Sequence, residues 1–196
     1  LGLVTPTTER PRELLARITR AAAAQLAQSY PQSRGDTTAT LAYVDRGERC
    51  LHFAQVGDSA ILRLRGSVSL LTPMHNSPFA SHALDRTLKR NGQDTQDHPD
   101  ELQGATVRAL RAEPDDVFLV CSDGVHGALT VPDLAAVYRE AFEDFAQINP
   151  DKTPSPDARA RLIAVRVMEK VLAKRDPRQD NATLIVLYCP AEESQT

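Results

Sequence analysis

Three aspartates in this chain share one local arrangement, in which a carboxylate stands at a turn beside an apolar, strand-like segment. They are Asp58 in residues 56–59 (VGDS), Asp123 in residues 121–124 (CSDG) and Asp180 in residues 179–183 (QDNAT). Strands packed in one fold can bring such ends together at one rim, and clustered carboxylates repel one another unless cations neutralise them. Oxygen donors of this kind suit hard ions such as Mg²⁺ or Mn²⁺. The three aspartates are therefore candidate metal ligands.

Each of these aspartates also has a simpler interpretation as a turn residue. Gly-Asp and Asp-Gly are common turn pairs, so any one of the three taken alone is more often structural than functional. The same arrangement occurs three times, each time beside an apolar segment. Taken together, the three turns favour a shared site.

The first half of the chain predicts a helix followed by short antiparallel strands. Apolar and small residues recur at helical spacing over 8–30, which indicates an amphipathic helix. Runs rich in β-forming residues follow at 37–44, 51–56, 60–64 and 68–71. The linkers between these runs are turn-formers, so we expect an antiparallel meander.

The second half of the chain mixes helices and strands. We expect helices over 79–91, 134–145 and 158–174, and strands over 106–110, 117–121 and 182–188. The last two strands are apolar, which indicates burial. The three prolines of 148–157 predict a surface loop before the last helix.

Length and composition limit the possible classes of protein. A chain of 196 residues with 41% hydrophobic content predicts one domain, residues 1–196. The net charge of −3 gives no excess positive field, which disfavours nucleic acid as a partner. No segment approaches the roughly 20 apolar residues that cross a membrane. The three cysteines lie far apart and adjoin apolar runs, which indicates free thiols in a reducing compartment. We therefore expect a cytoplasmic protein that binds neither nucleic acid nor membrane.

Five short motifs give the chain a resemblance to a known family. They are residues 35–39 (GDTTA), 56–59 (VGDS), 71–75 (LTPMH), 120–125 (VCSDGV) and 180–183 (DNAT). In this order and at this spacing, from about Asp36 to Leu187, they resemble the metal-dependent protein serine/threonine phosphatases, also called type two C or PPM phosphatases. Each motif is weak alone, and the five in register are specific.

The resemblance implies a fold and a set of site residues. The implied fold is α+β, with two antiparallel β-sheets packed as a sandwich and flanked by helices in four layers, αββα. Asp123 and Asp180 would bind the catalytic metal pair, and Asp58 would lie at an adjoining, weaker metal site shared with Asp123. The motif residues expected near this site are Thr37, Gly57, Ser59, His75, Gly124 and Asn181.

The resemblance also implies an activity. Members hydrolyse phosphoserine and phosphothreonine in phosphoprotein substrates with a metal-activated water, using two or three Mn²⁺ or Mg²⁺ ions. The chain would accordingly be a signalling hydrolase that dephosphorylates proteins. The resemblance assigns the catalytic role to metal ions, and no side chain of this sequence is assigned as general acid. All five histidines are expected to be structural, because only sequence proximity connects His75 and His126 with the motifs.

Several departures from the family pattern support an alternative. The family's Asp-Gly-X-Gly-Gly stretch, whose first aspartate bridges both metals, is not found here, nor are the preceding acidic residue and phosphate-binding arginine. We therefore expect the N-terminal strands to be missing and the chain alone to be weakly active or inactive. Ala60 stands where the family usually has arginine, and Met74 where an aspartate commonly precedes the histidine. The alternative is a non-catalytic, phosphatase-like regulatory or binding domain.

Overall fold

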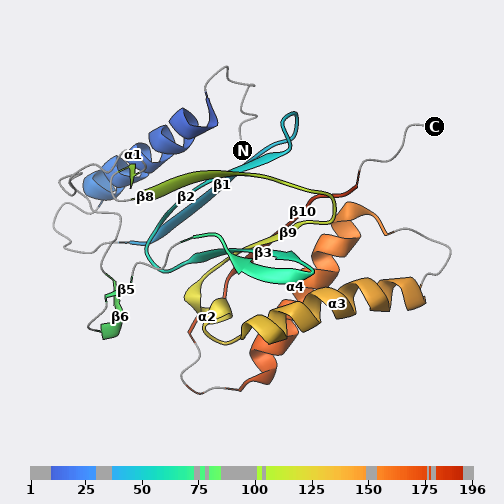
Figure 1. Ribbon diagram of the computed structural model, residues 1–196. Coiled ribbons are helices and arrows are strands. Elements are labelled where there is room, and N and C mark those ends of the chain that lie inside the picture. Colours follow the sequence, from blue (N-terminus) through green and yellow to red (C-terminus); the bar gives the residue numbers. More distant parts are fainter. Residues whose placement is uncertain are drawn as a thin grey trace. The chain divides into compact units, whose positions relative to one another are not determined.

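The computed structural model of the protein divides into two compact units, each built around one four-stranded antiparallel sheet (Figure 1). The first unit comprises Leu1–Gly57 and His75–Arg111, and the second comprises Asp58–Met74 and Ala112–Thr196. The structure describes residues 10–29, 37–72, 76–77, 80–84, 101–102, 105–148, 154–175, 177 and 180–191. Within these residues, every helix is too short or too polar to cross a membrane.

In its described residues, the first unit contains one helix, a four-stranded sheet and a small hairpin. Its sheet has the strand order β1-β2-β8-β7. The elements are α1 (Pro11–Ser29), β1 (Ala39–Asp45), β2 (Cys50–Val56), β5 (Asn76–Ser77), β6 (Ala80–Leu84), β7 (Glu101–Leu102) and β8 (Ala105–Arg111). The buried face of α1 carries Leu15, Ala16 and Ala23, and Ala23 packs with Val56 of β2. The helix therefore covers its own unit's sheet through small and apolar side chains at helical spacing.

The described part of the second unit contains a sheet with the strand order β10-β9-β3-β4 and three helices. Its elements are β3 (Ala60–Arg65), β4 (Ser67–Leu70), β9 (Val117–Cys121), α2 (Asp123–His126), α3 (Val131–Ile148), α4 (Pro156–Ala173) and β10 (Leu184–Tyr188). Ser155 caps α4, because its side chain accepts a hydrogen bond from the backbone N–H of Ala158. Thr130 and Asp133 exchange hydrogen bonds at the start of α3 in the manner of a capping box.

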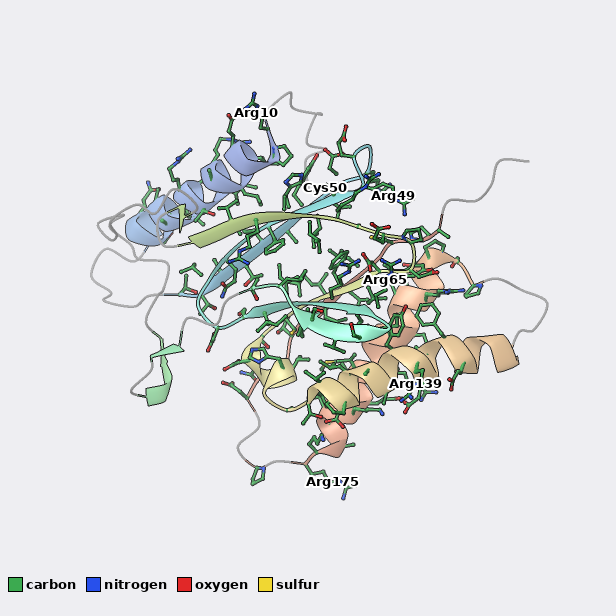
Figure 2. The ribbon with its side chains drawn as sticks, in the orientation of Figure 1. Arg10, Arg49, Cys50, Arg65, Arg139 and Arg175 are labelled. Atoms are coloured by element: carbon green, nitrogen blue, oxygen red, sulfur yellow. The ribbon has the colours of Figure 1, made fainter. Side chains whose placement is uncertain are left out.

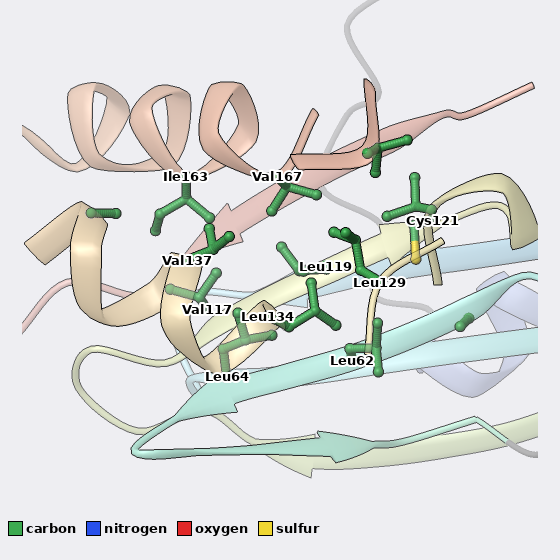
Figure 3. Packing of buried hydrophobic residues seen from close by; sticks show 14 residues of the cluster. Leu62, Leu64, Val117, Leu119, Cys121, Leu129, Leu134, Val137, Ile163 and Val167 are labelled. Carbon is green, nitrogen blue, oxygen red and sulfur yellow. The ribbon is translucent and has the colours of Figure 1, made fainter. Parts of the chain in front are cut away.

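One hydrophobic core holds the second unit together (Figure 3). Alternate residues of the central strands, such as Leu62 of β3 and Leu119 of β9, point to the face covered by α3 and α4. The helices contribute Val137, Ile163 and Val167 to the same core, and all of these side chains are 5% exposed or less. This packing fixes the strands that carry the candidate site.

The end of the second unit's sheet where β9 begins carries a buried ion pair. Asp116 is fully buried, and the guanidinium group of Arg63 bonds both of its carboxylate oxygens at 2.8 Å. The backbone N–H of Glu113 donates a further hydrogen bond of 2.8 Å to Asp116. Arg65, labelled in Figure 2, lies 3.9 Å from the same carboxylate. The hydrogen bonds satisfy the buried carboxylate of Asp116, so we interpret this ion pair as a group that stabilises the fold.

The α+β class, with two antiparallel sheets and flanking helices, is confirmed. The predicted first, third and fourth helices correspond to α1, α3 and α4, and six predicted strands are present as β1 to β4, β8 and β9. The three cysteines are free thiols, of which Cys121 is buried. The single domain over residues 1–196 stays a prediction.

Three predictions of local structure are wrong. The strands do not form one meander, because β2 pairs with β8 in the first sheet while β3 pairs with β9 in the second. The expected helix over 79–91 begins instead as β6, which pairs with β5, and its remainder lies outside the described residues. The last strand is shorter than predicted and only half-buried, since β10 stands at the edge of its sheet and Ile185 is 56% exposed.

Candidate active site

The register of the second sheet places the three aspartate turns at one end. Ala60 at the start of β3 pairs with Cys121 at the end of β9, and Cys121 also pairs with Leu184 at the start of β10. Asp58 comes just before β3, Asp123 just after β9 and Asp180 just before β10. Antiparallel pairing therefore brings together three segments that are far apart in the sequence.

Ser122 connects the turn of Asp123 to that of Asp180. Its hydroxyl donates to the carbonyl oxygen of Asn181 at 3.0 Å and accepts from the backbone N–H of Thr183 at 3.0 Å. Its own backbone N–H donates to the carbonyl oxygen of Thr183 at 3.1 Å. These three bonds extend the pairing of β9 and β10 beyond the strands and fix the two turns against each other.

Gly124 allows these two turns to approach more closely than any other residue would. A Cβ atom at this position would lie 2.5 Å from the carbonyl oxygen of Asn181 and 2.8 Å from that of Asp180. Carbon–oxygen contacts this short do not occur in real side chains. The glycine of the CSDG motif is therefore explained by the close passage of the backbone before β10.

The carboxylates of Asp123 and Asp180 are oriented by neighbouring backbone groups. One oxygen of Asp123 accepts from the N–H of Gly124 at 2.8 Å, and one oxygen of Asp180 accepts from the N–H of Asn181 at 2.6 Å. Asp58 and Asp123 are half-buried, whereas Asp180 is exposed. The turns therefore present oriented carboxylate oxygens at this end of the sheet.

His126 contacts the third turn. Its Nε2 atom lies 2.9 Å from the main-chain carbonyl oxygen of Asp58. Burial raises the pKa of the Cys121 thiol to about 12. The backbone N–H of His126 bonds this thiol and lowers its pKa to a smaller extent. His126 therefore touches both the end of β9 and the turn before β3.

The remaining predicted residues divide between the two units. Ser59 and Asn181 lie in the second unit beside the aspartates, whereas Thr37 and Gly57 belong to the first unit. Gly57 has a φ of +101°, and a Cβ there would lie 2.6 Å from Cβ of Thr38, so glycine is required. His75 lies outside the described residues.

The oxygen donors at this end are of the type that Mg²⁺ and Mn²⁺ prefer. Within the described ranges, however, His, Cys, Asp and Glu side chains form no group of three or more that could hold a metal ion. The donor chemistry thus fits a divalent ion, whereas the grouping of the described side chains is not that of a complete site. A shared ion between Asp58, Asp123 and Asp180 stays a prediction.

Sequence reasoning missed two residues at this end of the sheet. Ser122 was visible only as a neighbour of Asp123, although a serine between an apolar strand and an Asp-Gly turn is a signal for side-chain bonding to backbone. His126 stands three residues after Asp123. That spacing places both residues on one side of a helical turn, and it is the sequence feature that could have identified His126 as a neighbour of the site.

Two antiparallel sheets with helices, and aspartate turns gathered at one sheet end, agree with the fold that the motif resemblance implies. A family model described as "Protein phosphatase 2C" matches residues 4–181, and the chain belongs to this family. A search of curated protein sequences finds no match.

Solved structures support the same fold. The catalytic domain of the serine/threonine phosphatase PstP, in complex with two manganese ions, is similar with a TM-score of 0.63 and 20% identity, over 93% of this chain and 72% of that chain. The phosphatase MsPP from Mycobacterium smegmatis, in complex with cacodylate, has a TM-score of 0.63 and 19% identity, over 92% and 74%. PppA, a regulatory component of T6SS in Pseudomonas aeruginosa, has a TM-score of 0.56 and 20% identity, over 89% of this chain and 66% of that chain. The chain thus spans 66% of the length of PppA.

Proposed function

We propose that this chain is a metal-dependent phosphatase that acts on phosphoserine or phosphothreonine in proteins, with the aspartate end of the second sheet as its active site. The observation that carries the proposal is the mutual fixation of the turns of Asp123 and Asp180 through the hydroxyl of Ser122. Turns that serve only to reverse the chain have no need to be tied to one another in this way. Membership of the protein phosphatase 2C family supports the same assignment.

In this proposal, Asp123 and Asp180 hold Mn²⁺ or Mg²⁺, and Asp58 holds a further ion. When bound, such ions supply an activated water and positive charge for the phosphoryl oxygens. The contribution of the chain is geometric. Ser122 fixes the relation between two of the turns, and Gly124 allows them to approach. The backbone N–H groups that bond Asp123 and Asp180 orient these carboxylates.

The test is the hydrolysis of a phosphothreonine peptide with Mn²⁺ and with EDTA, for the wild-type chain, Asp123→Asn and Asp180→Asn. We expect a weak, Mn²⁺-dependent release of phosphate by the wild-type chain that falls by more than about 100-fold in each variant, because a direct ligand matters at least as much as the groups that orient it. Asp157→Asn is the matched control. Asp157 is 77% exposed and pairs only with Arg161 on the surface of α4 in the described contacts, so its loss should leave the rate unchanged.

The second candidate is a phosphatase-like domain that binds phosphoproteins without hydrolysing them. It is favoured by the absence of a closed group of three metal-ligating side chains among the residues described. A chain that binds Mn²⁺ but releases no phosphate from the peptide would support this candidate. A rate that is equal in wild type and Asp123→Asn would contradict the assignment of the active site to this end of the sheet.

A further inference from the structure

The side chain of His126 reaches from α2 to the turn that carries Asp58. The distance from Nε2 to the carbonyl oxygen of Asp58 is 2.9 Å, and the imidazole is half-buried. A carbonyl oxygen can only accept a hydrogen bond, so Nε2 must carry the hydrogen. The contact therefore fixes the orientation of the ring and occupies this nitrogen with a main-chain partner.

His126 is itself mounted on a well-anchored helical turn. Its backbone N–H bonds the buried thiol of Cys121, and the next N–H, that of Gly127, donates to the carbonyl oxygen of Asp123 at 2.7 Å. The same short helix, α2, begins with Asp123. Any movement of the imidazole relative to Asp123 is thus restricted by backbone hydrogen bonds and by the core beneath them.

The turn of Asp58 is of a different kind. Residues 57–59 lie outside regular strand structure, between the last residue of β2 and the first of β3. At the β2 end of the turn, the side chain of Gln55 donates a hydrogen bond to the carbonyl oxygen of Gly57. At Asp58, the bond from His126 ties the main chain of the turn to the helix that begins with Asp123.

From these contacts we propose that His126 is a positioning residue, which holds Asp58 at a fixed place relative to Asp123 through the main-chain carbonyl of Asp58. Ser122 does the equivalent for Asp180, so the three candidate ligands are all tied to the segment 121–126. This inference rests on the proposed function, since it gives the positioning a purpose in metal binding. It assigns a role to a residue that sequence reasoning treated as structural.

The experiment compares His126→Gln with His126→Asn. The amide nitrogen of glutamine reaches about as far from the backbone as Nε2 of histidine, whereas that of asparagine reaches only about as far as Nδ1. Glutamine can therefore keep the bond to the Asp58 carbonyl, and asparagine loses it. The matched control is His52→Asn, because His52 is a half-buried histidine on β2 of the first unit.

Two measurements are needed, and one of them requires no metal. Hydrogen exchange of the peptide containing Asp58, followed by mass spectrometry without metal, reports how firmly the turn is held. Calorimetric titration with Mn²⁺ reports the affinity of the site. We expect His126→Asn to accelerate exchange in this peptide and to weaken Mn²⁺ binding about tenfold, the lower end of the effects seen for groups that orient metal ligands. His126→Gln and His52→Asn should resemble the wild type.

The two measurements test the positioning role of His126 and the metal site of the proposed function separately. Unchanged exchange at Asp58 in His126→Asn overturns the positioning role, whatever the metal does. Faster exchange with an unchanged Mn²⁺ affinity also overturns it, because the turn would then move without consequence for the ligands. A wild-type chain that binds no Mn²⁺ contradicts the metal site of the proposed function and the purpose given to His126, and it is recognised without any variant.

Discussion

Replacement of Gly124 by alanine is the sharpest perturbation that the candidate site offers. The added Cβ would lie 2.5 Å from the carbonyl oxygen of Asn181, and real Cβ atoms keep at least 3.0 Å. The backbone before β10 must therefore retreat by about 0.5 Å, the difference between these distances. The atoms in the way are main-chain atoms that Ser122 bonds, so they cannot rotate aside as a side chain would.

The expected effect on stability is smaller than the effect on the site. Overpacking of this kind costs about 1–3 kcal/mol, and the higher helix propensity of alanine offsets up to about 1 kcal/mol. We expect a net loss of about 1–2 kcal/mol in the free energy of unfolding. The shift moves Asp180 away from Asp123, and hard divalent ions tolerate displaced ligands poorly, so Mn²⁺ affinity should fall about tenfold or more.

Urea denaturation without metal and calorimetric titration with Mn²⁺ measure these two effects separately. Gly47→Ala is the control, because a Cβ there would make only an ordinary contact of 3.5 Å with Asp45. It should change neither quantity appreciably. If Gly124→Ala unfolds at the wild-type urea concentration and binds Mn²⁺ with the wild-type affinity, the close passage of the two turns does not control the site.

Three further predictions concern the second unit. Asp116→Ala leaves the guanidinium of Arg63 without its partner and should cost about 3 kcal/mol in urea denaturation, the low end for a broken buried pair because Arg63 is 23% exposed; a loss below about 1 kcal/mol would contradict this. The pKa of Asp133 is lowered to about 2, chiefly by the backbone N–H of Thr130, so its contribution to stability is present above its unfolded pKa of 3.8 and is lost as the pH falls toward 2. Asp133→Asn should therefore flatten the fall in melting temperature between these pH values, and an unchanged slope would show that other carboxylates cause it. Burial raises the pKa of the Cys121 thiol to about 12, so iodoacetamide at pH 8 should leave this residue unmodified in the folded chain, as peptide mass spectrometry would detect.

The sequence predicted the elements whose pattern is local. The helices α3 and α4 have apolar residues at helical spacing, and β9 is an apolar run that is buried throughout except at Val120. The helix expected over 79–91 failed because Ala83 and Leu84 also fit a short strand, and pairing with β5 decided between the two. Spacing of a few apolar residues cannot distinguish a helix from a strand when a neighbouring segment is available for pairing.

The candidate site combines local patterns with contacts between residues that are distant in the sequence. The aspartates were identifiable because turn chemistry beside a strand is a local pattern. The meander failed at Gly57, where a left-handed glycine looks like a hairpin turn but leads from one sheet to the other. The bonds of Ser122 to Asn181 and of His126 to Asp58 join residues 59 and 68 positions apart, so only the folded chain reveals them.

The central claim is that the aspartate end of the second sheet binds divalent metal, and the location of bound Mn²⁺ in a crystal tests it most directly. Anomalous diffraction from crystals grown with Mn²⁺ would place the ion without reference to activity. We predict a strong peak within about 2.2 Å of carboxylate oxygens of both Asp123 and Asp180, a distance that suits oxygen ligands of small divalent ions. Crystals that show no peak at this end of the sheet, or that show Mn²⁺ only at other carboxylates, would contradict the claim.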